Sequence, residues 1–164
     1  MQNRHVKHPF GAVIDNDSKI LILGSVPSVK SVENNFYYMH PKNRFWKMLS
    51  ALLGVDLYSA DIPTRKHELL SRGIALYDSV EECDISGSSD SKITNVIPAD
   101  IPHLIENTKI IRIFCNGAAS YSNLLKYHPT LEAIVTKLPS TSPANAACSL
   151  ERLIEAWKVI LNYK

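Results

Sequence analysis

The chain has 164 residues and a formal net charge of only +2, and hydrophobic residues make up 45% of it. This length is typical of one domain with a substantial core, so we expect a single domain over residues 1–164. No apolar run approaches the length of about 20 residues that a membrane-spanning helix needs, and the small net charge does not by itself indicate a nucleic-acid partner.

The basic residues are concentrated in the first part of the chain. Residues 1–50 carry seven Lys and Arg against three Asp and Glu, whereas the rest of the chain carries eleven against thirteen. A surface that faces phosphate needs such a local excess, although ordinary variation in surface charge explains it equally well.

Cysteine usage favours a reducing environment. Cys83, Cys115 and Cys148 form no Cys-x-x-Cys pair, so the sequence predicts no zinc or iron–sulfur site, and we expect no cofactor. An odd count without a signal peptide favours an intracellular, cytoplasmic protein.

The first half of the chain predicts one buried strand followed by a long functional segment. Residues 1–19 are polar, and we expect His5 and His8 near this terminus to be solvated rather than ligands. The apolar run 20–23 predicts a buried strand that ends at Gly24. An aromatic-rich segment follows, and apolar residues at helical spacing predict a helix from about Asn43 to Gly54.

Three more strands are expected, over residues 73–77, 110–115 and 132–137. Between them, residues 56–63 predict a connector, 64–71 a short helix, and 83–91 a loop without a hydrophobic pattern. Further helices are expected after Asp100, over 118–127, and at the carboxyl end, where one face buries Leu150, Leu153, Ile154, Trp157, Ile160 and Leu161.

Strands that alternate with helices favour a parallel sheet with helices on both faces. We therefore predict an α/β fold, a three-layer α/β/α sandwich around a central four-stranded, mainly parallel sheet. The carboxyl ends of parallel strands gather at one edge, which is where open α/β sheets bind ligands. The residues that follow the four predicted strands are Gly24 with Ser25, Asp78, Asn116 with Gly117, and Pro139 with Ser140.

Two stretches resemble motifs of the uracil-DNA glycosylase superfamily. Residues 24–28 (GSVPS) and 38–46 (YMHPKNRFW) resemble its first motif, a Gly-x-Asn-Pro-Gly turn followed by an aromatic residue and His-Pro-x-Asn-x-Phe-Trp. Residues 138–143 (LPSTSP) resemble its serine-rich second motif. Val26 stands where the mismatch-specific branch carries its catalytic Asn and the main uracil branch an Asp, and this departure is similar to the hypoxanthine-DNA glycosylase branch.

The resemblance implies a monofunctional DNA glycosylase that flips out a deaminated base and hydrolyses its N-glycosidic bond, with hypoxanthine preferred and uracil as the alternative. The expected partner is double-stranded DNA, bound by a monomer without membrane association. Because Val26 lacks the usual polar group, a non-catalytic nucleic-acid-binding module remains an alternative. A small-molecule hydrolase or nucleotide-binding protein is disfavoured, because the sequence contains no P-loop, Rossmann or nucleophile-elbow motif.

Two asparagines are the candidate catalytic residues. Asn43 can orient a water and stabilise charge, but an amide is too weakly basic to take its proton. It can equally be a helix cap beside a core Phe-Trp pair. Asn116 matches a strand end that borders the pocket in the thymine branch, although Asn-Gly is also an ordinary turn.

The candidate base-binding residues are Gly24, Ser25, Val26, Tyr38 and Asp78. Tyr38 aligns with the aromatic residue that stacks the flipped base in the resembling branches, or is a half-buried core tyrosine. Backbone amides near Ser25 and Val26 can bind the base edge. Asp78 can hold a water or contact the base, or cap a turn. We expect His40 to make a structural hydrogen bond.

Short hydroxyl side chains suit contacts with phosphate oxygens, and basic side chains supply charge. The candidate DNA-binding residues are Ser28, Lys42, Arg44, Pro139, Ser140, Thr141 and Ser142. Alternatively, residues 138–145 are an ordinary connector in which Ser142, or the later Ser149, caps a helix.

Overall fold

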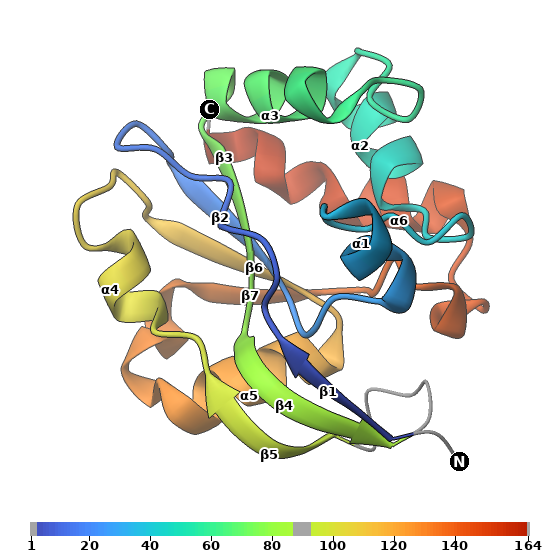
Figure 1. Ribbon diagram of the computed structural model, residues 1–164. Coiled ribbons are helices and arrows are strands. Elements are labelled where there is room, and N and C mark those ends of the chain that lie inside the picture. The colour runs from blue at the N-terminus through green and yellow to red at the C-terminus, as the bar shows by residue number, and fades with distance from the viewer. Residues whose placement is uncertain (1–2, 87–92, 164) are drawn as a thin grey trace.

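A four-stranded parallel sheet lies at the centre of the protein. The computed structural model describes residues 3–86 and 93–163, and Figure 1 shows their arrangement. The strands are β2 (Ile20–Gly24), β3 (Ile74–Asp78), β6 (Arg112–Asn116) and β7 (Val135–Leu138), in the order β3-β2-β6-β7. All three pairings are parallel, which confirms the predicted sheet.

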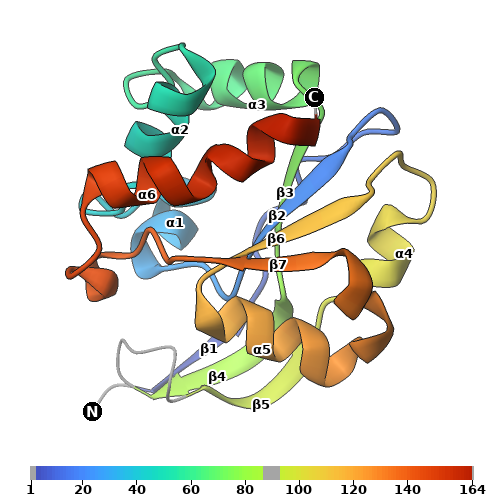
Figure 2. The ribbon, with the colours of Figure 1, turned by 180° about the vertical axis from the view of Figure 1, so that it is seen from behind.

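Helices cover both faces of this sheet, as Figure 2 shows from behind. One face carries α2 (Phe45–Leu53), α3 (Ile62–Ser71) and α6 (Leu150–Trp157), and the other carries α4 (Ile101–Ile105) and α5 (Ala118–Tyr127). Alternate side chains of β2 enter the two cores, because successive residues of a strand point to opposite faces. A strand buried on both faces is apolar throughout, which is why β2 was recognisable from sequence.

A second sheet was not predicted. It is antiparallel, in the order β1-β4-β5, and comprises β1 (Asn3–Lys7), β4 (Val80–Ser86) and β5 (Ile93–Pro98). The expected loop over 83–91 is therefore wrong for residues 83–86, and its remaining residues lie outside the described part of the chain. Val80, Cys83 and Ile85 form a small core with Val6, while polar side chains between them hide the strand pattern.

The chain passes from β3 to β4 with one residue between them, so one stretch of backbone takes part in both sheets (Figure 1). Ser79 N–H donates to Gly24 O (2.8 Å), and Val80 N–H donates to Ser25 O (3.2 Å). These bonds continue the pairing of β2 and β3 beyond the central sheet. The end of β2 is thus fixed where the predicted functional segment begins.

Several boundaries differ by a few residues from those expected. Helix α3 begins at Ile62, because the Asp61 side chain accepts from Thr64 N–H, so the expected connector over 56–63 is too long. The predicted last strand starts at Val135, because Pro129–Ile134 forms a 3₁₀ helix. Asp100 caps α4 as predicted.

The remaining short elements are α1 (Val29–Asn34) within the segment after β2, a 3₁₀ turn over Pro143–Asn145, and Lys158–Tyr163, which continues α6 as a 3₁₀ helix. In α6 and its 3₁₀ continuation, Leu153, Trp157 and Ile160 are buried, as the spacing of the apolar residues predicted. Among the described helices, none has the length and apolar character to cross a bilayer.

Candidate active site

The carboxyl ends of the central strands bring predicted site residues together. Gly24 lies opposite Asp78 in the pairing of β2 with β3, and Asn116 lies opposite Leu138 in that of β6 with β7. A Cβ on Gly24 would lie 2.3 Å from Asp78 Oδ1 and 3.0 Å from the Tyr38 hydroxyl oxygen. Only a residue without a side chain leaves room for these two groups, so Gly24 forms the floor between them.

Tyr38 packs as a core tyrosine, which was one of the two roles expected for it. Its ring stacks on Phe45, with centroids 4.0 Å apart, which joins it to the core. Its hydroxyl is buried and has no hydrogen-bond partner among the described residues. Burial first, and then the charge of Asp78, raise the pKa of Tyr38, whereas the nearby Asn116 side chain acts to lower it. Since buried polar groups are normally paired, this hydroxyl is a candidate contact for a ligand, with the Asn116 side chain beside it.

Thr141 connects the two candidate catalytic asparagines. Its hydroxyl donates to Asn43 Oδ1 (2.9 Å) and accepts from Asn116 Nδ2 (3.0 Å). Its backbone N–H donates to Asn116 Oδ1 (3.0 Å). Because a backbone N–H can only donate, this bond assigns the Asn116 oxygen and fixes the direction of the whole array. Thr141 itself is 1% exposed, so any contribution it makes to DNA binding is indirect.

Asn43 has features of both a cap and a site residue. Its Oδ1 also accepts from Phe45 N–H (2.9 Å), at the start of α2. Within the described residues, the hydrogen bonds to the Asn43 side chain are accepted by Oδ1, and they occupy both lone pairs of that oxygen. The Nδ2 group is the part of this amide that can donate to a water or a base.

Arg44 ties the second-motif loop to the start of α2. Its guanidinium donates to the carbonyl oxygens of Ser142 (3.0 Å), Asn145 (3.0 Å) and Cys148. Its backbone N–H donates to Thr141 O (3.1 Å). The guanidinium predicted to contact phosphate is thus bound to the protein, and it positions the loop.

Other residues of this loop are also held internally. Pro139 O accepts from Trp157 Nε1 (3.0 Å), and Ser140 Oγ accepts from Ser142 N–H (3.1 Å). Ser142 Oγ in turn accepts from Ala144 N–H (3.2 Å). The side chain of Ser140 packs close to Gly117, whose φ of 95° suits glycine.

The predicted phosphate-facing residues at the other side of the site differ in exposure. Ser28 caps α1 by accepting from Ser31 N–H (3.1 Å), and Ser31 itself is buried. Lys42 is exposed, and its backbone N–H donates to His40 Nδ1 (3.1 Å). His40 therefore makes the expected structural hydrogen bond.

Ser25 and Val26 occupy different surroundings although they are neighbours. Ser25 is buried, and its carbonyl is bound by Val80 N–H. The Val26 side chain packs against the small core of the second sheet, which contains Val6, Val80, Cys83 and Ile85. The apolar side chain at this position therefore contributes to packing.

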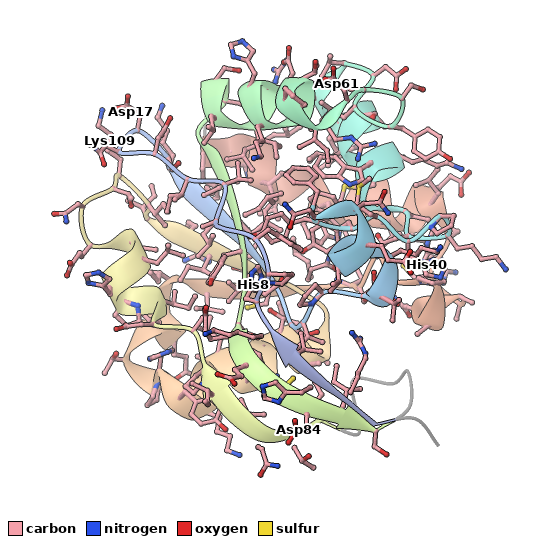
Figure 3. All side chains as sticks on the ribbon, viewed as in Figure 1. His8, Asp17, His40, Asp61, Asp84 and Lys109 are labelled. Carbon is pink, nitrogen blue, oxygen red and sulfur yellow. The ribbon has the colours of Figure 1, made fainter. Side chains whose placement is uncertain are left out.

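His8 is the site residue that the sequence missed, and the expectation that it is solvated is wrong. Its side chain is 1% exposed, and Nε2 lies 2.7 Å from Asp78 Oδ2. Figure 3 places it toward the middle of the molecule, whereas His40 lies at the periphery. The two partners are 70 residues apart in sequence, so no local pattern could have indicated the pair. His5, in contrast, is exposed as expected.

Two further observations bear on possible ligands. A cavity of about 500 Å³ lies at the opposite edge of the sheet, where Lys19, Ile20, Gly73 and Ile74 begin β2 and β3, and so it is not part of this site. Within residues 3–86 and 93–163, no three His, Cys, Asp or Glu side chains gather in a way that could hold a metal ion.

Together, the parallel sheet and the polar groups at its carboxyl edge define an α/β enzyme with its site at that edge. The family model of the uracil DNA glycosylase superfamily matches residues 10–161. The chain therefore belongs to the uracil DNA glycosylase superfamily, and it is a DNA glycosylase.

Similar proteins agree with this assignment. A protein from Methanosarcina acetivorans named hypoxanthine DNA glycosylase is 34% identical over 166 residues, covering 96% of this chain and 99% of the relative. One of the same name from Methanosarcina barkeri is 39% identical over 87 residues, covering 53% and 55%. A solution NMR structure of a Methanosarcina acetivorans protein assigned to the uracil DNA glycosylases has a TM-score of 0.78 and 33% identity, covering 92% and 93%.

Proposed function

We propose that this protein excises hypoxanthine from double-stranded DNA, acting as a monomeric, monofunctional enzyme formed by one domain over residues 1–164. Both curated relatives described above carry that substrate in their names. The observation that carries the proposal is the array of Asn43, Thr141 and Asn116 beside Gly24 and Tyr38. Because the substrate is DNA, we expect the enzyme to work inside the cell, in the cytoplasmic compartment.

The array suits hydrolysis of a glycosidic bond. Breaking this bond builds positive charge on the sugar and negative charge on the leaving base, and a water must be held at C1′. Asn43 can donate from Nδ2 to that water, because its oxygen is fixed by Thr141 and Phe45. Asn116 is held at both ends of its amide by Thr141, so it keeps the array rigid and borders the pocket.

Packing of Val26 supports the preference for hypoxanthine over uracil. The side chain at this position lies in the small core of the second sheet and offers no polar group to the base. The uracil-reading branches of the superfamily place an Asn or Asp there. We therefore propose that base recognition depends on Tyr38, Asp78 and the backbone amides near Ser25 and Val26.

We predict faster release of hypoxanthine than of uracil or xanthine. Purified protein is incubated with end-labelled duplexes that contain one of these bases, abasic sites are cleaved with alkali, and single-turnover rates are compared. A parallel reaction with an undamaged duplex gives the background. Faster uracil release from every duplex and from single strands would reverse the preference.

The same assay separates the alternative functions. Release of no base from any duplex, together with retained lesion binding, would identify a nucleic-acid-binding module. Strand cleavage before the alkali step would show a lyase rather than a monofunctional enzyme.

A further inference from the structure

The hydrogen bonds of His8 and Asp78 determine how many protons this pair carries. His8 Nδ1 lies 2.6 Å from the carbonyl oxygen of Phe10, which can only accept, so Nδ1 carries a hydrogen. His8 Nε2 lies 2.7 Å from Asp78 Oδ2, and a hydrogen must lie between these two atoms as well. The pair therefore carries two protons over His8 and Asp78, and it is neutral as a whole.

The second sheet delivers His8 to this position. Strand β1 pairs with β4, and His8 N–H continues the pairing by donating to Glu81 O (2.8 Å). Further along, Val13 and Leu76 exchange backbone hydrogen bonds of 2.8 and 3.0 Å, so the segment between them runs along β3. The segment that contains His8 is thus fixed to β4 at one end and to β3 at the other, and Asp78 is the last residue of β3.

The charged and titratable groups around the imidazole favour its protonated form. Asp78 and Glu81 are the carboxylates that act on it, and the rings of Tyr37 and Tyr77 lie 5.9 and 4.6 Å from its ring. Burial lowers the pKa of His8, but the hydrogen bond and charge of Asp78, the Phe10 carbonyl and the charge of Glu81 outweigh it, so the pKa lies above its ordinary value. Since both ring nitrogens also face oxygen atoms, we place the hydrogen between the partners on His8.

We propose that His8 is a positioning residue that holds Asp78 as a fixed, charge-compensated carboxylate, and that Asp78 reads the imino N–H of a deaminated base. The inference rests on the proposed function, and it names how the site tells hypoxanthine from adenine and uracil from cytosine. Asp78 Oδ2 is bound by His8, while Oδ1 lies at the floor of the site beside Gly24 and the Tyr38 hydroxyl.

Deamination changes the ring nitrogen next to the former amino carbon. In adenine and cytosine this nitrogen has a lone pair, whereas in hypoxanthine and uracil it carries a hydrogen. A carboxylate accepts a hydrogen bond from the ring N–H of hypoxanthine or uracil, and it repels the ring lone pair of adenine or cytosine. A site that hydrogen-bonds a group of its substrate strongly rejects analogues without that group, because the polar group of the site is then left unpaired.

The imidazolium also removes an electrostatic conflict. When the glycosidic bond breaks, its electron pair goes to the base, a water oxygen bonds to C1′, and the water's proton leaves to solvent. An uncompensated carboxylate would repel the base as it becomes negative. With His8 protonated, the pair is neutral, is not consumed, and keeps its contact with the imino N–H throughout.

The test compares His8→Gln with His5→Gln. The glutamine amide at position 8 can still donate to Asp78 but cannot carry a charge, so we expect single-turnover hypoxanthine release at pH 7 to fall roughly 10²-fold. In the wild type, release should also fall as pH rises through the raised pKa of His8, and this alkaline fall should be absent in the variant. The substrate's own N–H ionises identically for both enzymes, so the difference between the profiles isolates His8.

His5→Gln is the matched control, because His5 is paired with carboxylates too, those of Glu82 and Asp84, but its side chain is 57% exposed and does not contact Asp78. We expect its rate and pH profile to equal those of the wild type. A second variant, Asp78→Asn, should lower the ratio of hypoxanthine to adenine release at least about tenfold, because its amide can donate to the adenine lone pair.

One measurement needs no variant. The pKa of the His8 imidazole, followed by NMR in the wild type, should coincide with the pKa of the alkaline fall in base release. A wild-type enzyme that releases hypoxanthine while these two values disagree, or a His8→Gln profile equal to the wild type, overturns the inference alone. A wild type that releases no base overturns the proposed function and the inference with it.

Discussion

Thr141 determines how the two asparagines of the site can act. Its hydroxyl proton points to Asn43, and its oxygen is bound by Asn116, so each amide has one orientation. Removal of either asparagine leaves an unpaired group on the buried Thr141, through which the other asparagine is held. We therefore expect substitutions at Asn43 and Asn116 to be coupled rather than additive.

At the residue scale, Asn43→Ala should lower single-turnover base release by roughly two orders of magnitude, the scale of losing a transition-state hydrogen bond. Lesion binding and the fold should survive, because the lost bond to Phe45 N–H at the helix start costs only about 1 kcal/mol and the lost bond from the Thr141 hydroxyl about as much. Rapid-quench kinetics and thermal unfolding of the same sample measure both effects. If Asn43 is only a cap, the melting temperature falls while the rate per folded molecule does not.

Asn116→Ala provides the comparison for this prediction. It removes two hydrogen bonds to Thr141, whereas Asn43→Ala removes one to Thr141 and one to Phe45 N–H, so we expect losses of stability of similar size. A large rate loss in Asn116→Ala with Asn43→Ala near normal would transfer the water-orienting role to Asn116. Equal losses in the single and double variants would mean that the two amides act as one unit.

At the element scale, the sequence predicted what local patterns can encode. Buried parallel strands are apolar runs, so β2 and β6 were recognised, and their carboxyl ends identified the edge that carries the site. The second sheet escaped because β4 buries only alternate side chains against few partners. His8 escaped because its partner belongs to a distant strand, and only the fold brings them together.

A prediction about the second-motif loop follows from Arg44. Its three bonds to carbonyl oxygens need the planar guanidinium, so Arg44→Lys should already lose most of them. We expect Arg44→Lys to lower the free energy of unfolding by about 2 kcal/mol, measured by urea denaturation. Amide exchange should quicken in residues 142–148 more than in α5.

Lys42→Arg changes a nearby exposed cation and serves as the control. It should leave the free energy of unfolding and the amide exchange of residues 142–148 unchanged. Equal stability of the two variants would show that Arg44 does not hold the loop.

At the scale of the whole molecule, a net charge of +2 leaves little general attraction to DNA, so binding should depend on the local excess in residues 1–50. We predict that log affinity falls linearly with log salt, and that Lys42→Ala reduces this slope by about one because one phosphate contact is lost. Fluorescence anisotropy with an abasic-site duplex measures it. His67→Ala, on exposed α3, should not change the slope, and binding that ignores salt would exclude phosphate contacts.

The shared backbone of β3 and β4 makes the two sheets one mechanical unit. Residues 80–86 cannot leave the small sheet without loosening the bonds of Ser79 and Val80 to the end of β2. We expect amides of β3 and β4 to exchange with solvent in one cooperative opening, which hydrogen exchange measures directly. Substitutions in the small core, such as Cys83→Ser, should then quicken this opening and expose the floor of the site more often. The second sheet would in this way govern how long the active site of each molecule stays intact.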